Sequence, residues 1–132
     1  MQPIDVVRRF IIEYQTGRHR AAALELLAPD FIDHTPFPGF GPERESVLAL
    51  FNMLWMAFPD LTPEILEQLA QDDRVATRKV FRGTHRGEFL GMAPTGKAVA
   101  IQVIDIVRIQ DSRISEHWNV VDAASLIRQL QS

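Results

Sequence analysis

Asp105 is the residue whose type and position point most directly to chemistry. It stands in the segment 98–109, where the alternate positions around it are branched and aliphatic: Val99, Ile101, Val103, Val107 and Ile109. A carboxylate on such a face must be paired, hydrogen-bonded or placed in a lined cavity, because burying an unpartnered charge is unfavourable. In an apolar pocket a carboxylate becomes a stronger base, which suits removal of a proton beside a carbonyl group. The structural alternative is an ion pair with an arginine such as Arg78 or Arg108.

Three further candidates lie on the strand that we expect to pair with residues 98–109. Depending on the turn, either His117 and Asn119 or Trp118 share the face of Asp105. Histidine suits proton transfer near neutral pH, and tryptophan suits the wall of an apolar ligand pocket. The structural alternatives are that Trp118 belongs to the core and that His117 bonds to the backbone.

Other candidates come from the loops. His85 ends a predicted strand beside two glycines, where the mouth of a site could open; a surface turn is the alternative. His34 lies with Phe37 in a loop rich in proline and phenylalanine. This loop could close over an apolar ligand, and ordinary loop packing is the alternative.

Several common chemistries are excluded by residue type and spacing. The chain has no cysteine, which excludes a thiolate nucleophile, a disulfide framework and a cysteine-based metal site. Its four histidines show no H-x-H or H-E-x-x-H spacing and there is no G-x-S-x-G motif, so we expect no metal and no serine nucleophile. With 14 basic and 17 acidic residues the net charge is −3, and no basic face for nucleic acid is expected.

Length and composition fit one globular domain over residues 1–132. The chain is 46% hydrophobic and 23% charged, which are ordinary proportions for such a domain. The first residues lack the basic end and apolar stretch of a signal peptide, and no segment could span a bilayer. We therefore expect a soluble, cytoplasmic domain that does not contact a membrane.

The order of periodic patterns predicts an α+β fold. Apolar residues at helical spacing predict three N-terminal helices: one ended by a left-handed Gly17, one over 18–27, and one closed by Pro59. Alternating patterns then predict four strands, at 61–69, 75–84, 98–109 and 113–121. Asp122 is expected to cap a short C-terminal helix. Helices followed by antiparallel strands favour helices packed on one face of a curved sheet.

The predicted strand 98–109 also indicates a partner. Its second face carries Ile104 and Ile106, so both faces are apolar at the centre. The chain's own helices can cover one face, and a second subunit is the simplest cover for the other. We therefore expect a homodimer through the sheet.

Five segments together resemble the SnoaL-like polyketide cyclase family, also called ester cyclases, within the group that shares the nuclear transport factor two fold. They are LAPDFIDH (27–34), AFPDL (57–61), GTHRGEFLGMAPTG (83–96), DIVRI (105–109) and ISEHWN (114–119). The resemblance, which runs from Val7 to Leu130, implies a cone-shaped fold with an apolar cavity between three helices and a curved sheet. It also implies closure of a polyketide methyl ester ring by an intramolecular aldol reaction, without metal or cofactor.

Two positions depart from the family's pattern. The acid/base aspartate that the cyclases carry on the last strand corresponds here to Asn119, and a site histidine corresponds to Asp105. We therefore expect Asp105 as the base, His117 or His85 as proton donor or orienting group, and Asn119 as a hydrogen-bond donor to the enolate oxygen. Contacts with the ligand are expected from His34, Phe37, Trp55 and Trp118.

The resemblance further predicts that His34, His85 and His117 line one cavity. The expected function is acid–base chemistry on a small hydrophobic carbonyl or ester compound. The alternatives are a non-catalytic small-molecule binding protein, a structural dimer whose cavity is filled by its own side chains such as Trp55, or a hydrolase, isomerase or hydroxylase sharing the fold.

Overall fold

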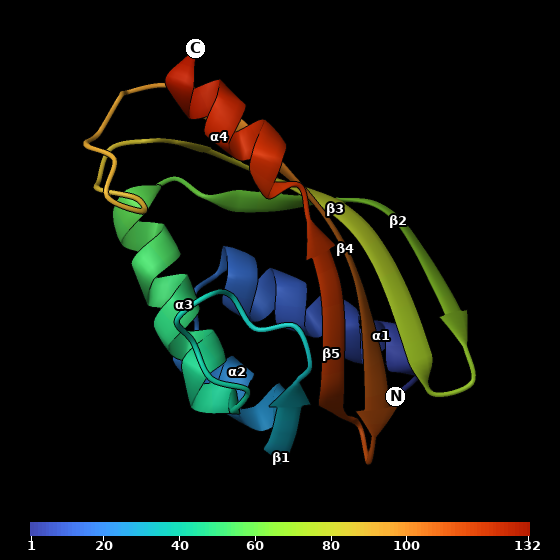
Figure 1. Cartoon of the computed structure of the whole chain (residues 1–132). Helices are drawn as coiled ribbons and strands as arrows, with labels where there is room; N and C mark the ends of the chain where they lie inside the picture. The colour runs from blue at the N-terminus through green and yellow to red at the C-terminus, as the bar shows by residue number, and fades with distance from the viewer.

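The computed structural model describes residues 1–132 and shows an α+β fold built on one five-stranded sheet (Figure 1). In chain order the strands are β1 (Leu27–Asp33), β2 (Thr62–Gln71), β3 (Arg74–Thr84), β4 (Ala98–Gln110) and β5 (Arg113–Val121). Their order across the sheet is β1-β5-β4-β3-β2, with β1 parallel to β5 and all other neighbours antiparallel. The predicted α+β class with a mainly antiparallel sheet is confirmed, and the curved sheet stays open between its edge strands β1 and β2.

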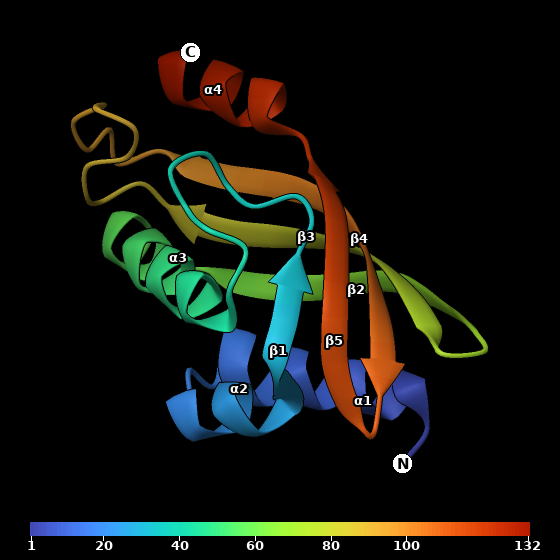
Figure 2. The ribbon, with the colours of Figure 1, turned by 60° about the horizontal axis from the view of Figure 1, so that its bottom comes forward.

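The N-terminal helices cover one face of this sheet (Figure 2). The helical elements are α1 (Pro3–Arg9), the π-helical segment η1 (Phe10–Thr16) that continues it, α2 (Arg20–Leu26), α3 (Arg44–Ala57) and α4 (Ala123–Gln131). Asp122 caps α4 as predicted, because its side chain accepts a hydrogen bond from the N–H of Ser125 at 3.1 Å. The core lies between helices and sheet, so a site there must be built from inward-facing side chains.

The alternation of β4 determines which candidate residues face inward. Its odd-numbered residues from Val99 to Ile109, Asp105 included, are buried. The register sets Asp105 between Thr77 of β3 and Asn119 of β5. A two-residue turn with positive φ at both Asp111 and Ser112 closes the β4–β5 hairpin, the geometry that matches strand twist. His117 and Asn119 therefore share the inward face with Asp105, while Trp118 faces outward.

The strand β1 was not predicted, and one helix end differs from expectation. The β1 segment contains Pro29 and two aspartates, which weaken a strand pattern, but a proline is tolerated at a sheet edge. Gly17 has a φ of −79°, so the predicted left-handed glycine is wrong, and Arg18 takes that conformation instead with a φ of 60°. Gly17 is required for close approach, since a Cβ there would lie 2.9 Å from the carbonyl oxygen of Glu13.

The outer face of the sheet is open to solvent in the single chain. Ile104 is 53% exposed, Ile106 41% and Val120 76%. The apolar character expected of this face is present, and the homodimer stays a prediction. None of the helices has the length and apolarity needed to traverse a membrane.

Candidate active site

A cavity of about 420 Å³ opens between the inner face of the sheet and the helices. Its volume is within the range of about 300–1,000 Å³ usual for small-molecule sites, so it is not filled by the chain's own side chains. Most of the wall is aliphatic or aromatic, and Phe37 is the one predicted ligand contact on it. Polar side chains line it at a few positions: Gln15, Asp33, Thr35, Lys79, Asp105, His117 and Asn119.

Asp33 and His117 form a hydrogen-bonded pair on the cavity wall. The parallel pairing of β1 with β5 sets the two residues side by side, and Nδ1 of His117 lies 3.0 Å from Oδ1 of Asp33. Burial opposes ionisation of Asp33, but the bond with His117, helped by Thr35, outweighs it and holds the pKa of Asp33 below its ordinary value. An ionised carboxylate only accepts, so the proton of the neutral imidazole lies on Nδ1. The basic atom is then Nε2, to which no protein group donates.

Thr35 fixes the orientation of Asn119 in the same wall. The Thr35 hydroxyl donates to Oδ1 of Asn119 at 2.9 Å and accepts from the backbone N–H of Asn119 at 2.8 Å. The backbone N–H of Thr35 also donates to Oδ1 of Asp33 at 3.0 Å. Because this network occupies the amide oxygen of Asn119, its Nδ2 is the group left free to donate.

Asp105 lines the cavity as expected, but it is paired with a lysine. Its Oδ2 lies 3.0 Å from Nζ of Lys79, and the two side chains are only 7% and 5% exposed. Lys79 also donates to Oε1 of Gln15 at 3.2 Å. Arg78 and Arg108, the partners considered from the sequence, lie on the outer face and pair with glutamates. Asp105 therefore forms a buried ion pair, as the structural alternative expected, but its partner is Lys79 in place of an arginine.

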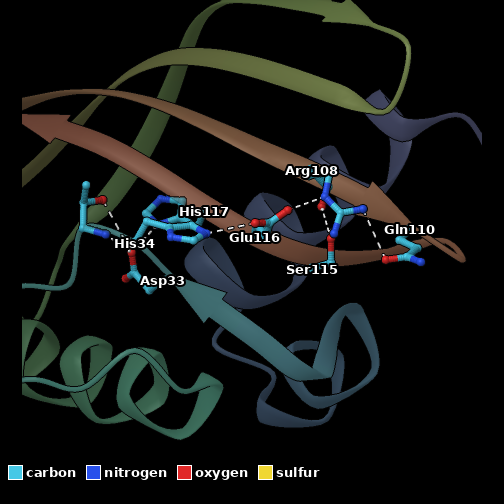
Figure 3. A network of polar contacts seen from close by, with 8 residues as sticks. Asp33, His34, Arg108, Gln110, Ser115, Glu116 and His117 are labelled. Carbon is cyan, nitrogen blue, oxygen red and sulfur yellow. Dashed lines mark hydrogen bonds and ion pairs between the residues drawn. The ribbon is translucent and has the colours of Figure 1, made fainter.

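A second acid–histidine pair lies on the opposite face of the same strands (Figure 3). Nε2 of His34 lies 2.9 Å from Oε1 of Glu116, and Arg108 donates to the other carboxylate oxygen. Arg108 first, and His34 second, hold the pKa of Glu116 below its ordinary value. The His34 ring stacks on Trp118 with centroids 4.7 Å apart, and the guanidinium of Arg74 covers the same indole at 5.1 Å. His34 and Trp118 therefore lie outside the cavity.

His85 and Trp55 are also outside the cavity wall. His85 is fully buried and its Nδ1 accepts the N–H of Thr95 at 3.2 Å, which ties down the loop between β3 and β4. Trp55 of α3 packs against Tyr14 of η1 and Phe51 of α3. The prediction that His34, His85 and His117 line one cavity is wrong, because only His117 is on the cavity wall. His34 faces the outer side of the sheet, and His85 is bonded to the loop between β3 and β4.

Four polar residues of the cavity were not found from the sequence as site residues. Asp33 and Thr35 flank His34 at the end of β1, and the pattern of this strand is too weak to indicate that they face inward. Lys79 is a charge on the buried face of β3, the same signal that singled out Asp105 on β4. Gln15 follows a tyrosine in a helical apolar stripe, and nothing in the sequence indicates that it lines the cavity.

The chain is similar to proteins of one known family. The family profile described as SnoaL-like polyketide cyclase matches residues 5–130. The aklanonic acid methyl ester cyclase AcmA of Streptomyces galilaeus is 30% identical over 135 residues, covering 98% of this chain and 90% of AcmA. DnrD of Streptomyces peucetius, also named an aklanonic acid methyl ester cyclase, is 29% identical over 134 residues, covering 96% of this chain and 89% of DnrD.

Solved structures of similar sequence share the fold of this chain. IdmH from Streptomyces antibioticus, a candidate polyketide cyclase, is 32% identical with a TM-score of 0.88, and the match covers 100% of both chains. AclR from Streptomyces galilaeus, a candidate hydroxylase, is 26% identical with a TM-score of 0.86, covering 98% of this chain and 80% of AclR. The chain belongs to the SnoaL-like polyketide cyclase family, as its sequence segments predicted.

Proposed function

We propose that this protein is an acid–base enzyme that acts without a cofactor on a hydrophobic carbonyl or ester compound held in the cavity. The observation that carries the proposal is the 3.0 Å bond between Asp33 and His117 in the wall of an apolar cavity. The relatives AcmA and DnrD, which are named aklanonic acid methyl ester cyclases, support ring closure of a methyl ester as the reaction class. The resemblance to the family implies that this closure is an aldol reaction.

The general base in this proposal is His117. Nε2 takes a proton from the carbon beside a carbonyl group, and ionised Asp33 stabilises the imidazolium that forms. The resulting enolate carbon forms a bond to a second carbonyl carbon of the same molecule, and that carbonyl becomes an alkoxide. The imidazolium returns its proton to the alkoxide, so the cycle needs no other reactant. A positioned base of this kind contributes about 10²–10⁴-fold to the rate.

In this proposal Asn119 has the role expected from the sequence, and Asp105 does not. The free Nδ2 of Asn119 can donate to the developing enolate oxygen, which is the role expected of it. Asp105 is not our candidate base, because its charge is compensated by the ammonium of Lys79. Moving the base from Asp105 to His117 keeps the acid–base chemistry and changes the residue that performs it.

Solvent exchange of the methyl protons of 2-acetylnaphthalene tests this function without knowledge of the natural substrate. ¹H NMR in D₂O should show enzyme-catalysed exchange that falls by about 10²-fold or more in His117→Gln. Asp33→Asn should fall too, because the imidazolium loses its compensating charge. His19→Gln changes an exposed histidine outside the cavity and is the matched control. Exchange that survives in folded His117→Gln would overturn the proposal.

A non-catalytic binding protein is the second candidate. It is favoured by the amide of Asn119, which cannot accept a proton, and by the pairing of Asp105 with Lys79. This function needs the cavity and no free base. Affinity for 2-acetylnaphthalene without any exchange above the solvent rate would support it over the enzyme.

A further inference from the structure

Proton abstraction by His117 does not explain why one part of the cavity wall is polar. Gln15 of η1, Lys79 of β3 and Asp105 of β4 converge there and are only 6%, 4% and 6% exposed. Nζ of Lys79 lies 3.0 Å from Oδ2 of Asp105 and 3.2 Å from Oε1 of Gln15. A cluster of this kind is less favourable than apolar packing unless its polar atoms are satisfied. We call these three residues the Lys79 cluster.

The Lys79 cluster has hydrogen-bonding capacity that the protein does not use. An ammonium has three donors, and the protein gives that of Lys79 one hydrogen bond, to Gln15, and one ion pair, to Asp105. Nε2 of Gln15 donates to no protein group, and Oδ1 of Asp105 accepts from none. The cluster thus offers a ligand both donors and a charged acceptor within one small area of the wall.

We propose that the Lys79 cluster is a subsite for a neutral hydroxyl group, phenolic or enolic, on the molecule held in the cavity. A hydroxyl donates one hydrogen bond and accepts another, so it pairs with Oδ1 of Asp105 and with a free donor of Lys79 or Gln15 together. The charges of Asp105 and Lys79 compensate each other, so the subsite has no net charge to attract an ion. An ether oxygen has no proton for Asp105, and a carboxylate is repelled by it.

The position of the subsite follows from the sheet register. Asp105 stands opposite Asn119, and His117 lies two residues before Asn119 in β5, on the same face. Diagonal neighbours across antiparallel strands are about 7–8 Å apart. A rigid aromatic ligand can therefore hold its hydroxyl at the Lys79 cluster while its carbonyl side chain lies at His117. The inference rests on the proposed function only in that both use a ligand in this cavity.

Calorimetric binding of three matched probes to the wild-type protein tests the subsite. The probes are 2-naphthol, 2-methoxynaphthalene and 2-naphthoate, which share the ring system and differ in one substituent. Because hydrogen bonds to charged groups are the stronger kind, we expect 2-naphthol to bind about 10- to 100-fold tighter than 2-methoxynaphthalene. The carboxylate should bind no better than the ether. Equal affinity for naphthol and ether, preference for the carboxylate, or no binding of any probe would overturn the subsite.

Variants then locate the preference within the cavity. The double variant Lys79→Met/Asp105→Leu replaces the charges by side chains of similar size, and Gln15→Leu removes the amide while keeping the ion pair. The naphthol preference should disappear in the double variant, weaken in Gln15→Leu and persist in His117→Gln. A preference lost only in His117→Gln would place the hydroxyl at the histidine and refute the subsite. Failure here leaves exchange by His117 intact, so the two proposals are tested separately.

Discussion

Asp105→Asn should strongly destabilise the protein although it hardly changes the shape of the side chain. The substitution removes the charge that compensates the ammonium of Lys79, which lies 3.0 Å away with 5% of its side chain exposed. Breaking a buried ion pair by removing one partner costs about 3–5 kcal/mol. Unfolding entropy of roughly 2.1 cal/mol/K per residue amounts to about 0.28 kcal/mol/K for this chain, so the melting temperature should fall by about 11–18 °C.

Thermal unfolding followed by far-UV circular dichroism measures this effect. Lys79→Met should lower the melting temperature by a similar amount, since it leaves the carboxylate of Asp105 uncompensated. The double variant Lys79→Met/Asp105→Leu should recover most of the loss, because it removes both buried charges together. A melting temperature for Asp105→Asn within about 3 °C of wild type, roughly 1 kcal/mol, would refute the reasoning. It would mean that water in the cavity solvates each charge separately.

Three further outcomes are expected. Stability should decline as the pH falls below about 4, because the fold holds the pKa of Asp33 and the pKa of Asp60 below their ordinary values. The stability that these two carboxylates contribute is present above their pKa in the unfolded chain. It is lost as the pH falls through their lower pKa in the folded protein. Urea midpoints at pH 7 and pH 3 measure this decline, which should be smaller in Asp33→Asn. Light scattering should give a dimer of the 15.0 kDa chain, and Ile104→Lys on the outer face should give a monomer; a monomeric wild type would contradict the predicted interface. Asp122→Ala should lower the free energy of unfolding by about 1 kcal/mol through loss of the α4 cap, with Glu88→Ala on an exposed loop as a comparison. An unchanged urea midpoint for Asp122→Ala would be evidence against the cap.

The parts of the site that could be predicted are those that depend on local patterns. Strand alternation placed Asp105 on a buried face, and the hairpin brought His117 and Asn119 within reach of it. The choice between His117 and Trp118 required the turn geometry, which depends on positive φ angles that the sequence pattern alone left open.

The parts that could not be predicted depend on contacts between distant segments. Asp33 and His117 are 84 positions apart in the sequence and meet through the parallel pairing of β1 with β5. The alternation of apolar and polar residues in β1 is too weak to predict that pairing. The partner predicted for Asp105 is an arginine, which is a common choice for buried ion pairs. Lys79 occupies that position, and the alternation of the predicted strand 75–84 was a signal that it faces inward and Arg78 outward. His34 and Trp118 match the family's segments, yet their stack forms on the outer face of the sheet.

The tautomer of His117 tests the central claim most directly, because the proposed chemistry requires a basic Nε2 held by a proton on Nδ1. Long-range ¹H–¹⁵N NMR of the wild-type protein, at a pH where the ring is neutral, distinguishes the two ring nitrogens. The structure predicts a protonated Nδ1 bonded to Asp33 and an unprotonated Nε2, and this preference should weaken in Asp33→Asn. A neutral His117 with its proton on Nε2 in the wild-type protein would contradict the claim, since the cavity would then contain no histidine base.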